Sequence, residues 1–364
     1  MVPMYRACYN SLTMAFKPIS FPDDHSSHTA SIEWWYWNGH LADKKGNRYA
    51  FMDCFFKTDI SKITIPHFKA VTFEKFIGKN RYAYFAHSVV SDITNQKNYK
   101  EIQDISMVSD DSFKRQRFFL NYIDPIIIHG YDNNEMAEIA PDVFHIKSRY
   151  LDLNLKSHKP ALLEGGEGHT SVCGRDSYYY SLTDLSAKGV LTINGKRTEV
   201  EGKAWMDHQW MDVTYELNKW SWFSIQLDNG TEIMCCEYDK GTDKTNLVDL
   251  STAHRDQKHF SSLILKPGTD TWKSKLTKAE YPMSWDIEIP DHKAILHAHS
   301  LMSDQEMIFA AINYWEGPIE ITGTIDGKDV KGTGFMELVG YPADYSYLLS
   351  LGREVKKEII GNRV

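Results

Sequence analysis

An internal repeat constrains the fold of this chain more than any other feature of its sequence. The segment 192–207 contains Thr-Ile-Asn-Gly-Lys followed by Val-Glu-Gly-Lys-Ala-Trp-Met-Asp. The segment 324–337 contains Thr-Ile-Asp-Gly-Lys followed by Val-Lys-Gly-Thr-Gly-Phe-Met-Glu. A repeat of this length indicates two copies of one fold, and the cleft between two copies is a natural place for a ligand.

The beginnings of the two copies match as well. Trp35-Tyr36-Trp37 leads to a turn at Gly46, and Trp220-Ser221-Trp222 leads to a turn at Asn229-Gly230. A chain of 364 residues is long enough for two or three domains, and the repeat selects two.

The repeat divides the chain into four parts. Residues 1–30 are a lead-in, 31–212 the first copy, 213–350 the second copy and 351–364 a charged tail. The junction between the copies follows the polar and aromatic run Asp207-His208-Gln209-Trp210, which the second copy lacks.

The pattern within each copy is that of β-strands. Short runs rich in Val, Ile, Tyr, Phe and Trp are separated by turn residues, and Asn194-Gly195, Asn229-Gly230 and Asp326-Gly327 are strong hairpin signals. Many evenly spaced strands predict an all-β fold of two tandem β-barrels, and about eight strands in a barrel leave room for one small ligand. Helical periodicity is scarce, and Ala343 to Arg353 is expected to form a short C-terminal helix.

Composition excludes several classes of protein. The formal net charge of -8 and the scattered Lys and Arg residues argue against a nucleic-acid partner. No apolar run approaches the roughly 18 residues that span a bilayer. The five cysteines are an odd number without a C-x-x-C pair, so we expect buried thiols, with adjacent Cys235 and Cys236 on opposite faces of a strand.

The expected location follows from the thiols and the N-terminus. Buried free thiols are typical of a reducing compartment, and the first residues contain no continuous apolar stretch like that of a signal peptide. The sequence as it stands therefore favours the cytoplasm. A periplasmic or secreted location stays open if the N-terminus is processed.

The unrepeated run at the junction carries the sharpest chemical signal. Asp207 pairs with Glu337 in the repeat, whereas Leu338 and Gly340 stand where the first copy has His208 and Trp210. Asp207 is placed to orient or charge His208, or to act itself as a general acid. The alternative is a buried polar network that ties the two barrels together.

A second signal opens the first copy at Glu33-Trp34-Trp35-Tyr36. In a strand, Glu33 and Trp35 share one face, and Trp34 and Tyr36 share the other. Burying an ionised carboxylate between large aromatic rings is costly, so the pKa of Glu33 is expected to rise. The alternative is a surface carboxylate at a strand end.

Other polar residues in apolar strands are weaker candidates. His87 is a lone strand histidine, which more often has a structural role, and Tyr238-Asp239 offers a further hydroxyl and acid. His297 and His299 share a strand face, but no third metal ligand is evident and H-E-x-x-H is absent. Walker, G-x-G-x-x-G and G-x-S-x-G motifs are also absent, so neither a metal nor any other cofactor is expected.

Several of these motifs together resemble the AttH/CrtC lipocalin-like family, which includes carotenoid 1,2-hydratases, kievitone hydratase and fungal decalin-forming Diels–Alderases. The matching segments lie between about residues 20 and 345, and the string Trp-Met-Asp-His-Gln-Trp is the most specific of them. The segments are Glu33 to Leu41, Ala86 to Asp92, Tyr180 to Thr183, Gly202 to Trp210, Tyr314 to Gly317 and Gly334 to Tyr341.

The resemblance implies two lipocalin-like barrels with a hydrophobic ligand pocket in or between them. It implies functional roles for His208 and Trp210, and it makes Tyr238 with Asp239 the nearest match to a Tyr/Asp pair of the hydratases. The candidate catalytic residues are Asp207, His208, Trp210, Tyr238 and Asp239. The candidate ligand-binding residues are Glu33, Trp34, Trp35, Tyr36, His87 and Trp222.

The reaction that these residues favour is the hydration of a C=C bond in a large isoprenoid or polyketide-like substrate, without a cofactor. Asp207 or Asp239, with a pKa raised by burial, would protonate the alkene. Trp210, Trp34 or Trp35 would stabilise the cation, and His208 would orient the acid or activate water.

Two alternatives stay open. A cyclase of the Diels–Alderase kind would fold a polyene into a reactive shape, so that proximity supplies most of the rate. A lipocalin-like carrier would bind a hydrophobic ligand and release it unchanged. In all three cases the partner is a hydrophobic small molecule, and both a peripheral membrane contact to collect it and the oligomeric state stay open.

Overall fold

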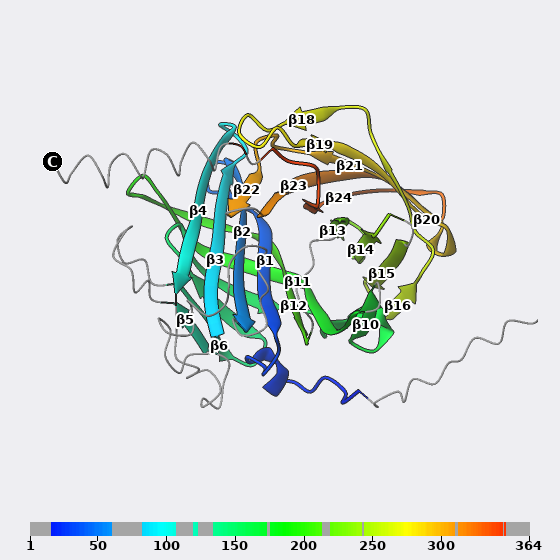
Figure 1. Ribbon diagram of the computed structural model, residues 1–364, viewed down its shortest axis with the longest axis horizontal. Coiled ribbons are helices and arrows are strands. Elements are labelled where there is room, and N and C mark those ends of the chain that lie inside the picture. Colours follow the sequence, from blue (N-terminus) through cyan, green and yellow to red (C-terminus); the bar gives the residue numbers. More distant parts are fainter. Residues whose placement is uncertain are drawn as a thin grey trace, which may run out of the picture.

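The computed structural model describes residues 16–59, 82–106, 119–122, 134–172, 175–212, 219–241, 244–309, 312–344 and 346. These residues form two large antiparallel sheets, a two-stranded ribbon and three short 3-10 helices. Figure 1 shows the two curled sheets packed against each other. The predicted all-β, lipocalin-like fold is therefore confirmed.

The first sheet has the strand order β4-β3-β2-β1-β12-β11-β8-β7-β6-β5, with β9 and β10 paired to β11. Its strands are β1 (Ile32–Asp43), β2 (Arg48–Asp59), β3 (Tyr82–Asp92), β4 (Lys97–Ser106), β5 (Phe119–Tyr122), β6 (Asn134–Ala140), β7 (Val143–Lys147), β8 (Leu151–Ser157), β9 (Leu162–Leu163), β10 (His169–Val172), β11 (Arg175–Ile193) and β12 (Lys196–Met211). The 3-10 helices η1 (Asp23–His25) and η4 (Glu164–Gly166) accompany it.

The second sheet has the order β16-β15-β14-β13-β24-β23-β21-β20-β17, with β22 paired to β23. Its strands are β13 (Lys219–Leu227), β14 (Glu232–Asp239), β15 (Lys244–Ser251), β16 (Gln257–Phe260), β17 (Ile264–Pro267), β20 (Ser284–Ile289), β21 (Ala294–Ser300), β22 (Glu306–Phe309), β23 (Ile312–Ile325) and β24 (Lys328–Val339). The ribbon is β18 (Thr271–Lys273) with β19 (Glu280–Pro282), and η5 (Pro290–His292) precedes β21.

The predicted hairpin turns are confirmed. Asn194-Gly195 joins β11 to β12 and Asp326-Gly327 joins β23 to β24, and all four residues have positive φ, as a two-residue type I′ turn requires. At Asn229-Gly230, which joins β13 to β14, Gly230 has a φ of 76° and the backbone N–H of Leu227 bonds to the carbonyl of Thr231.

Alternation along the strands creates three separate cores. The first core lies inside the first sheet and includes Trp35 and Trp37, and the second core lies inside the second sheet and includes Trp315. Between the sheets lies an interface core, which includes Tyr36 and Trp222. The two sheets are thus joined by a continuous layer of buried side chains.

The strand register changes the alignment of the two copies of the repeat by one residue at their first strands. Tyr36 stands opposite Asp207 in the β1–β12 pair, and Trp222 stands opposite Glu337 in the β13–β24 pair. Because Asp207 and Glu337 are equivalent, Tyr36 corresponds to Trp222. The sequence match that paired Trp37 with Trp222 is one residue out, and such a slip moves a side chain to the other face of the sheet.

The remaining sequence-based expectations have mixed outcomes. Cys235 lies in the second core and Cys236 in the interface core, as predicted, and both are free thiols. The predicted helix from Ala343 to Arg353 falls almost wholly outside the described residues. Within the described residues, no helix is long and apolar enough to cross a membrane.

Candidate functional site

Asp207 and His208 are neighbours on β12, and the strand sends them to opposite faces. Asp207 bonds to Tyr179 and Trp205, which belong to the interface core, whereas His208 bonds to Glu33 and Tyr180 inside the first sheet. The expectation that Asp207 orients or charges His208 is therefore wrong, because adjacent residues of a strand point apart. Two polar centres result, one on each side of the sheet.

Asp207 is almost fully buried and accepts three hydrogen bonds. Ser181 Oγ and Trp205 Nε1 lie 2.5 and 2.6 Å from Oδ1, and the Tyr179 hydroxyl lies 2.8 Å from Oδ2. Burial is the largest influence and outweighs these donors, so it raises the pKa of Asp207 to about 6. A small fraction of this carboxyl is then protonated at neutral pH.

Two glutamates of the second sheet join Asp207. Glu316 on β23 and Glu337 on β24 are opposite each other in the ladder, and both are fully buried. The Tyr36 hydroxyl donates to Glu316 Oε1 at 2.5 Å, and Trp220 Nε1 donates to Glu337 Oε2 at 3.0 Å. We call Asp207, Glu316 and Glu337 the carboxyl cluster.

The carboxyl cluster holds its protons tightly. Burial raises the pKa of Glu337 to about 7, with a further rise from the charge of Asp207. Burial, with the charge of Glu337, raises the pKa of Glu316 well above its ordinary value. Like charges in a dry site cannot all ionise, so the cluster retains at least one proton at neutral pH.

Aromatic side chains from both sheets surround the carboxyl cluster. Trp222 Nε1 donates to the Tyr179 hydroxyl at 3.0 Å, and the Trp222 ring packs edge-on against Tyr36 with centroids 5.4 Å apart. The half-buried rings of Trp34 and Tyr238 pack against the same interface core. The three carboxyl groups therefore have largely apolar, aromatic surroundings.

A line of polar side chains connects Asp207 to the protein surface. Ser181 Oγ lies 2.5 Å from both Asp207 Oδ1 and Glu164 Oε1, and Asp249, the neighbour of Glu164, lies 2.9 Å from His259 Nδ1. The His259 side chain is 39% exposed. Burial beside Asp249 raises the pKa of Glu164 well above its ordinary value. The Ser181 hydroxyl has only one proton to donate. This hydroxyl is the donor in both contacts, so Asp207 and Glu164 share its proton.

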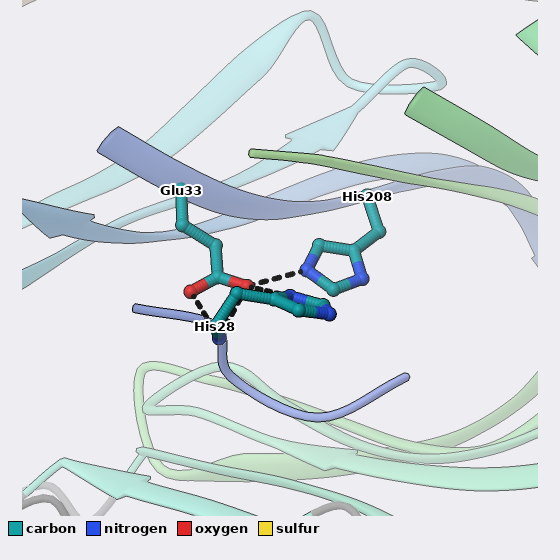
Figure 2. Close-up of side chains that lie close together, drawn as sticks. All are labelled: His28, Glu33 and His208. Atoms are coloured by element: carbon teal, nitrogen blue, oxygen red, sulfur yellow. Dashed lines mark hydrogen bonds and ion pairs between the residues drawn. The ribbon is translucent and has the colours of Figure 1, made fainter. Parts of the chain in front are cut away.

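The second polar centre is centred on Glu33 (Figure 2). His208 Nε2 lies 2.9 Å and His28 Nδ1 lies 2.8 Å from the same oxygen, Glu33 Oε1. The ammonium of Lys57, also fully buried, lies 3.3 Å from Glu33 Oε2. We call His28, Glu33 and His208 the histidine cluster.

The charge states in the histidine cluster correct a second expectation. Burial alone would raise the pKa of Glu33, but the hydrogen bonds from His208 and His28 and the charge of Lys57 hold it well below its usual range. The expected rise is wrong because the sequence pattern does not show these three partners. Burial lowers the pKa of His208 to about 4, whereas bonds to Asp24 and Glu33 raise that of His28 despite its burial.

Trp210 and Trp35 stack on the two imidazoles of the histidine cluster. Its ring stacks on His28 with centroids 3.8 Å apart and planes 5° apart, and it also stacks on Tyr178 at 5.1 Å. Trp35 stacks on His208 at 4.6 Å. These two tryptophans therefore hold the imidazoles inside the first sheet and lie on the other side of it from Asp207.

The structure also places the remaining candidate residues His87, Tyr238 and Asp239. His87 is buried and bonds to the Tyr314 hydroxyl of the second sheet. Tyr238 lies at the interface core, but Asp239 lies at the strand end, where it accepts the Gly241 N–H at 2.6 Å. Asp239 is only half-buried, so the expectation of a buried acid there is wrong.

Sequence reasoning missed the members of both centres that come from distant segments. Glu316 and Glu337 complete the carboxyl cluster, and His28 and Lys57 complete the histidine cluster. The repeat did pair Glu337 with Asp207, and this equivalence could have marked Glu337 as a further candidate site residue. His28 lies five residues before Glu33, in a lead-in that has no periodic pattern.

Comparisons with known proteins agree with this fold. A family model described as AttH-like matches residues 13–341. Kievitone hydratase of Fusarium solani subsp. phaseoli is 22% identical over 327 residues, covering 87% of this chain and 84% of that protein. The dehydratase asqC of Emericella nidulans is 21% identical over 201 residues, covering 52% of this chain and 57% of that protein.

Solved structures show the same arrangement. The AttH-type protein of Nitrosomonas europaea superposes with a TM-score of 0.67 at 26% identity, covering 89% of this chain and 98% of that one. Kievitone hydratase of Nectria haematococca gives a TM-score of 0.67 at 15% identity, with 90% and 94% covered. CghA in complex with Sch210972 gives 0.53 at 11% identity, with 86% and 89% covered. With a family match across nearly the whole length, this chain belongs to the AttH-like family.

Proposed function

We propose that this protein is a cofactor-independent enzyme that adds water to a C=C bond of a large hydrophobic substrate, with the carboxyl cluster as its acid and base. One observation carries the proposal: Asp207, Glu316 and Glu337 are buried together between the sheets among aromatic rings. An acid with a pKa near the working pH transfers protons most efficiently, and Glu337 meets that condition.

The reaction divides between two carboxyls. Glu337, whose hydrogen bond comes from Trp220, gives its proton to one alkene carbon, and a carbocation forms on the other. Water adds to that carbon, and the proton that the water loses passes to Asp207, whose three donors stabilise its ionised form. The π faces of Tyr36 and Trp222 stabilise the cation.

The cycle closes when the proton returns from Asp207 to Glu337. The polar line through Ser181, Glu164 and Asp249 to His259 supplies a route by which protons exchange with solvent. Each of its side chains is either a titratable group or a hydroxyl, and both kinds can pass a proton on. His208 takes no part in this route, because it lies on the other face of β12. The hydratase and dehydratase among the relatives support water addition or removal as the reaction class.

The alternative is a cyclase, in which the same aromatic frame folds a polyene and the carboxyls serve only to hold the sheets together. Removing the charge of one carboxyl would then change the rate little, while reshaping Trp222 would change it much. A pure carrier would release its ligand unchanged.

The test is a turnover assay with isoprenoid and polyketide alkenes in ¹⁸O-labelled water, read by mass spectrometry. We expect a product heavier by one labelled water, and a rate lower by on the order of 100-fold in Glu337→Gln. His297→Gln is the control, because His297 is exposed on β21. An isomer of unchanged mass would instead support cyclisation, and unchanged ligand from all three proteins would overturn the enzymatic function for these compounds.

A further inference from the structure

The histidine cluster is independent of the reaction proposed above, and its geometry has its own implication. His28 Nδ1, His208 Nε2 and Glu33 Oε1 all lie within 4.8 Å of one another. They come from three separate segments: the lead-in before β1, the start of β1 and the end of β12. Figure 2 shows both imidazoles directed at the same carboxylate oxygen.

We propose that His28, Glu33 and His208 form a binding site for a divalent transition-metal ion of the Zn²⁺ class. Two imidazole nitrogens and one carboxylate oxygen are a ligand set that such ions accept, with further positions left for water. The two nitrogens lie 2.8 and 2.9 Å from Glu33 Oε1. Bonds of about 2.0 Å at tetrahedral angles require about 3.3 Å between ligand atoms, so a small outward movement of the side chains admits the ion.

The groups behind the ligands support this assignment. His28 Nε2 lies 3.2 Å from Asp24 Oδ1, and His208 Nδ1 lies 3.2 Å from the Tyr180 hydroxyl. Metal-binding histidines usually have such a partner on the far nitrogen, which fixes the ring orientation. Both bonds leave the nitrogen that faces Glu33 as the one available to the ion.

The charges around the site set its affinity. Glu33 offers a carboxylate oxygen to the ion, and its side chain is fully buried together with that of His208. Lys57 opposes binding, because its ammonium lies 3.3 Å from Glu33 Oε2 and inside the same buried site.

The test uses the full chain after chelator treatment and dialysis, titrated with Zn²⁺ by calorimetry and with Co²⁺ by visible spectroscopy. We expect one equivalent to bind, with cobalt bands typical of mixed nitrogen and oxygen ligands. Binding should be lost in His208→Gln and in His28→Asn, and should weaken by about 10-fold to 100-fold in Asp24→Asn. Lys57→Met should strengthen it by on the order of tenfold.

The matched control is His297→Gln, because His297 and His299 form an exposed pair on β21 that could hold an ion at the surface. This variant should bind like the wild type. His28 lies in the lead-in rather than in a strand, so His28→Asn keeps the test valid if His208→Gln fails to fold, as judged by circular dichroism. Absence of binding to the wild type, or binding that only His297→Gln removes, would overturn the proposal.

Discussion

Tyr36 of the first sheet donates a hydrogen bond of 2.5 Å to Glu316 of the second sheet, across the interface between the two copies of the repeat. In its own sheet Tyr36 stands opposite Asp207, and in the second sheet Glu316 stands opposite Glu337. The two copies therefore meet face to face, and the carboxyl cluster takes Asp207 from β12 of the first copy and Glu316 and Glu337 from β23 and β24 of the second. The duplication itself creates the site.

Tyr36→Phe tests this contact. The substitution leaves Glu316 Oε1 buried without its donor, which should lower the free energy of unfolding by about 1–3 kcal/mol. Urea unfolding followed by tryptophan fluorescence measures the loss. Tyr49→Phe is the control, because Tyr49 is a buried ring of the same sheet whose hydroxyl bonds to no other described side chain. Equal losses in the two variants would contradict a special role of the Tyr36–Glu316 bond.

Glu337→Gln should change how stability depends on pH. The pKa of about 7 in the folded protein lies above the ordinary 4.5, so the folded form keeps a proton that the unfolded chain has lost. The stability from this carboxyl is thus fully present below about pH 4.5 and is lost as the pH rises through about 7. Glutamine is neutral at every pH.

The difference between variant and wild type should therefore be near zero at about pH 4. At about pH 8 the variant should be more stable by on the order of 3 kcal/mol. Chemical unfolding at a series of pH values measures this difference. A difference that does not vary with pH would show that Glu337 titrates with its ordinary pKa.

Glu33→Gln should destabilise the protein through Lys57. The substitution removes the carboxylate beside a fully buried ammonium, and breaking such a pair costs about 3–5 kcal/mol. Lys57→Met in the same chain should recover most of the loss, since no uncompensated charge then remains. A double-mutant cycle on unfolding free energies measures the coupling, and simple additivity of the two single losses would refute it.

Ser181→Ala should raise the pKa of Asp207 further. The serine hydroxyl donates to Asp207 Oδ1 at 2.5 Å and so stabilises the ionised carboxyl. Carboxyl ¹³C NMR of protein labelled at aspartate measures the titration directly. A titration midpoint that stays the same or falls would show that Ser181 does not donate to Asp207.

Local sequence patterns predicted the local structure well. The turns at Asn194-Gly195 and Asp326-Gly327 need only residues that tolerate positive φ, and the opposite faces of Cys235 and Cys236 follow from the period of a strand. The same period also separates Asp207 from His208. Chain adjacency suggested a pair there, although strand geometry excludes it.

Contacts between distant segments could not be predicted in this way. Glu316 is 280 residues from Tyr36, and no pattern in either segment indicates that they meet. The pKa of Glu33 depends on His28, His208 and Lys57, which reach it through folding of the lead-in and through pairing of β1 with β12 and β2. Burial alone, the influence that the sequence suggested, has the opposite sign.

The most direct test of the account is infrared spectroscopy of the carbonyl stretch of protonated carboxyl groups, measured through a pH titration in ²H₂O. We expect protonated carboxyl absorption in the wild type at about pH 7. Glu316→Gln should remove one component of this absorption, and Glu337→Gln should remove a second component that titrates near pH 7. Spectra without protonated carboxyl absorption at about pH 7, or unchanged in both variants, would contradict a buried acid between the two sheets.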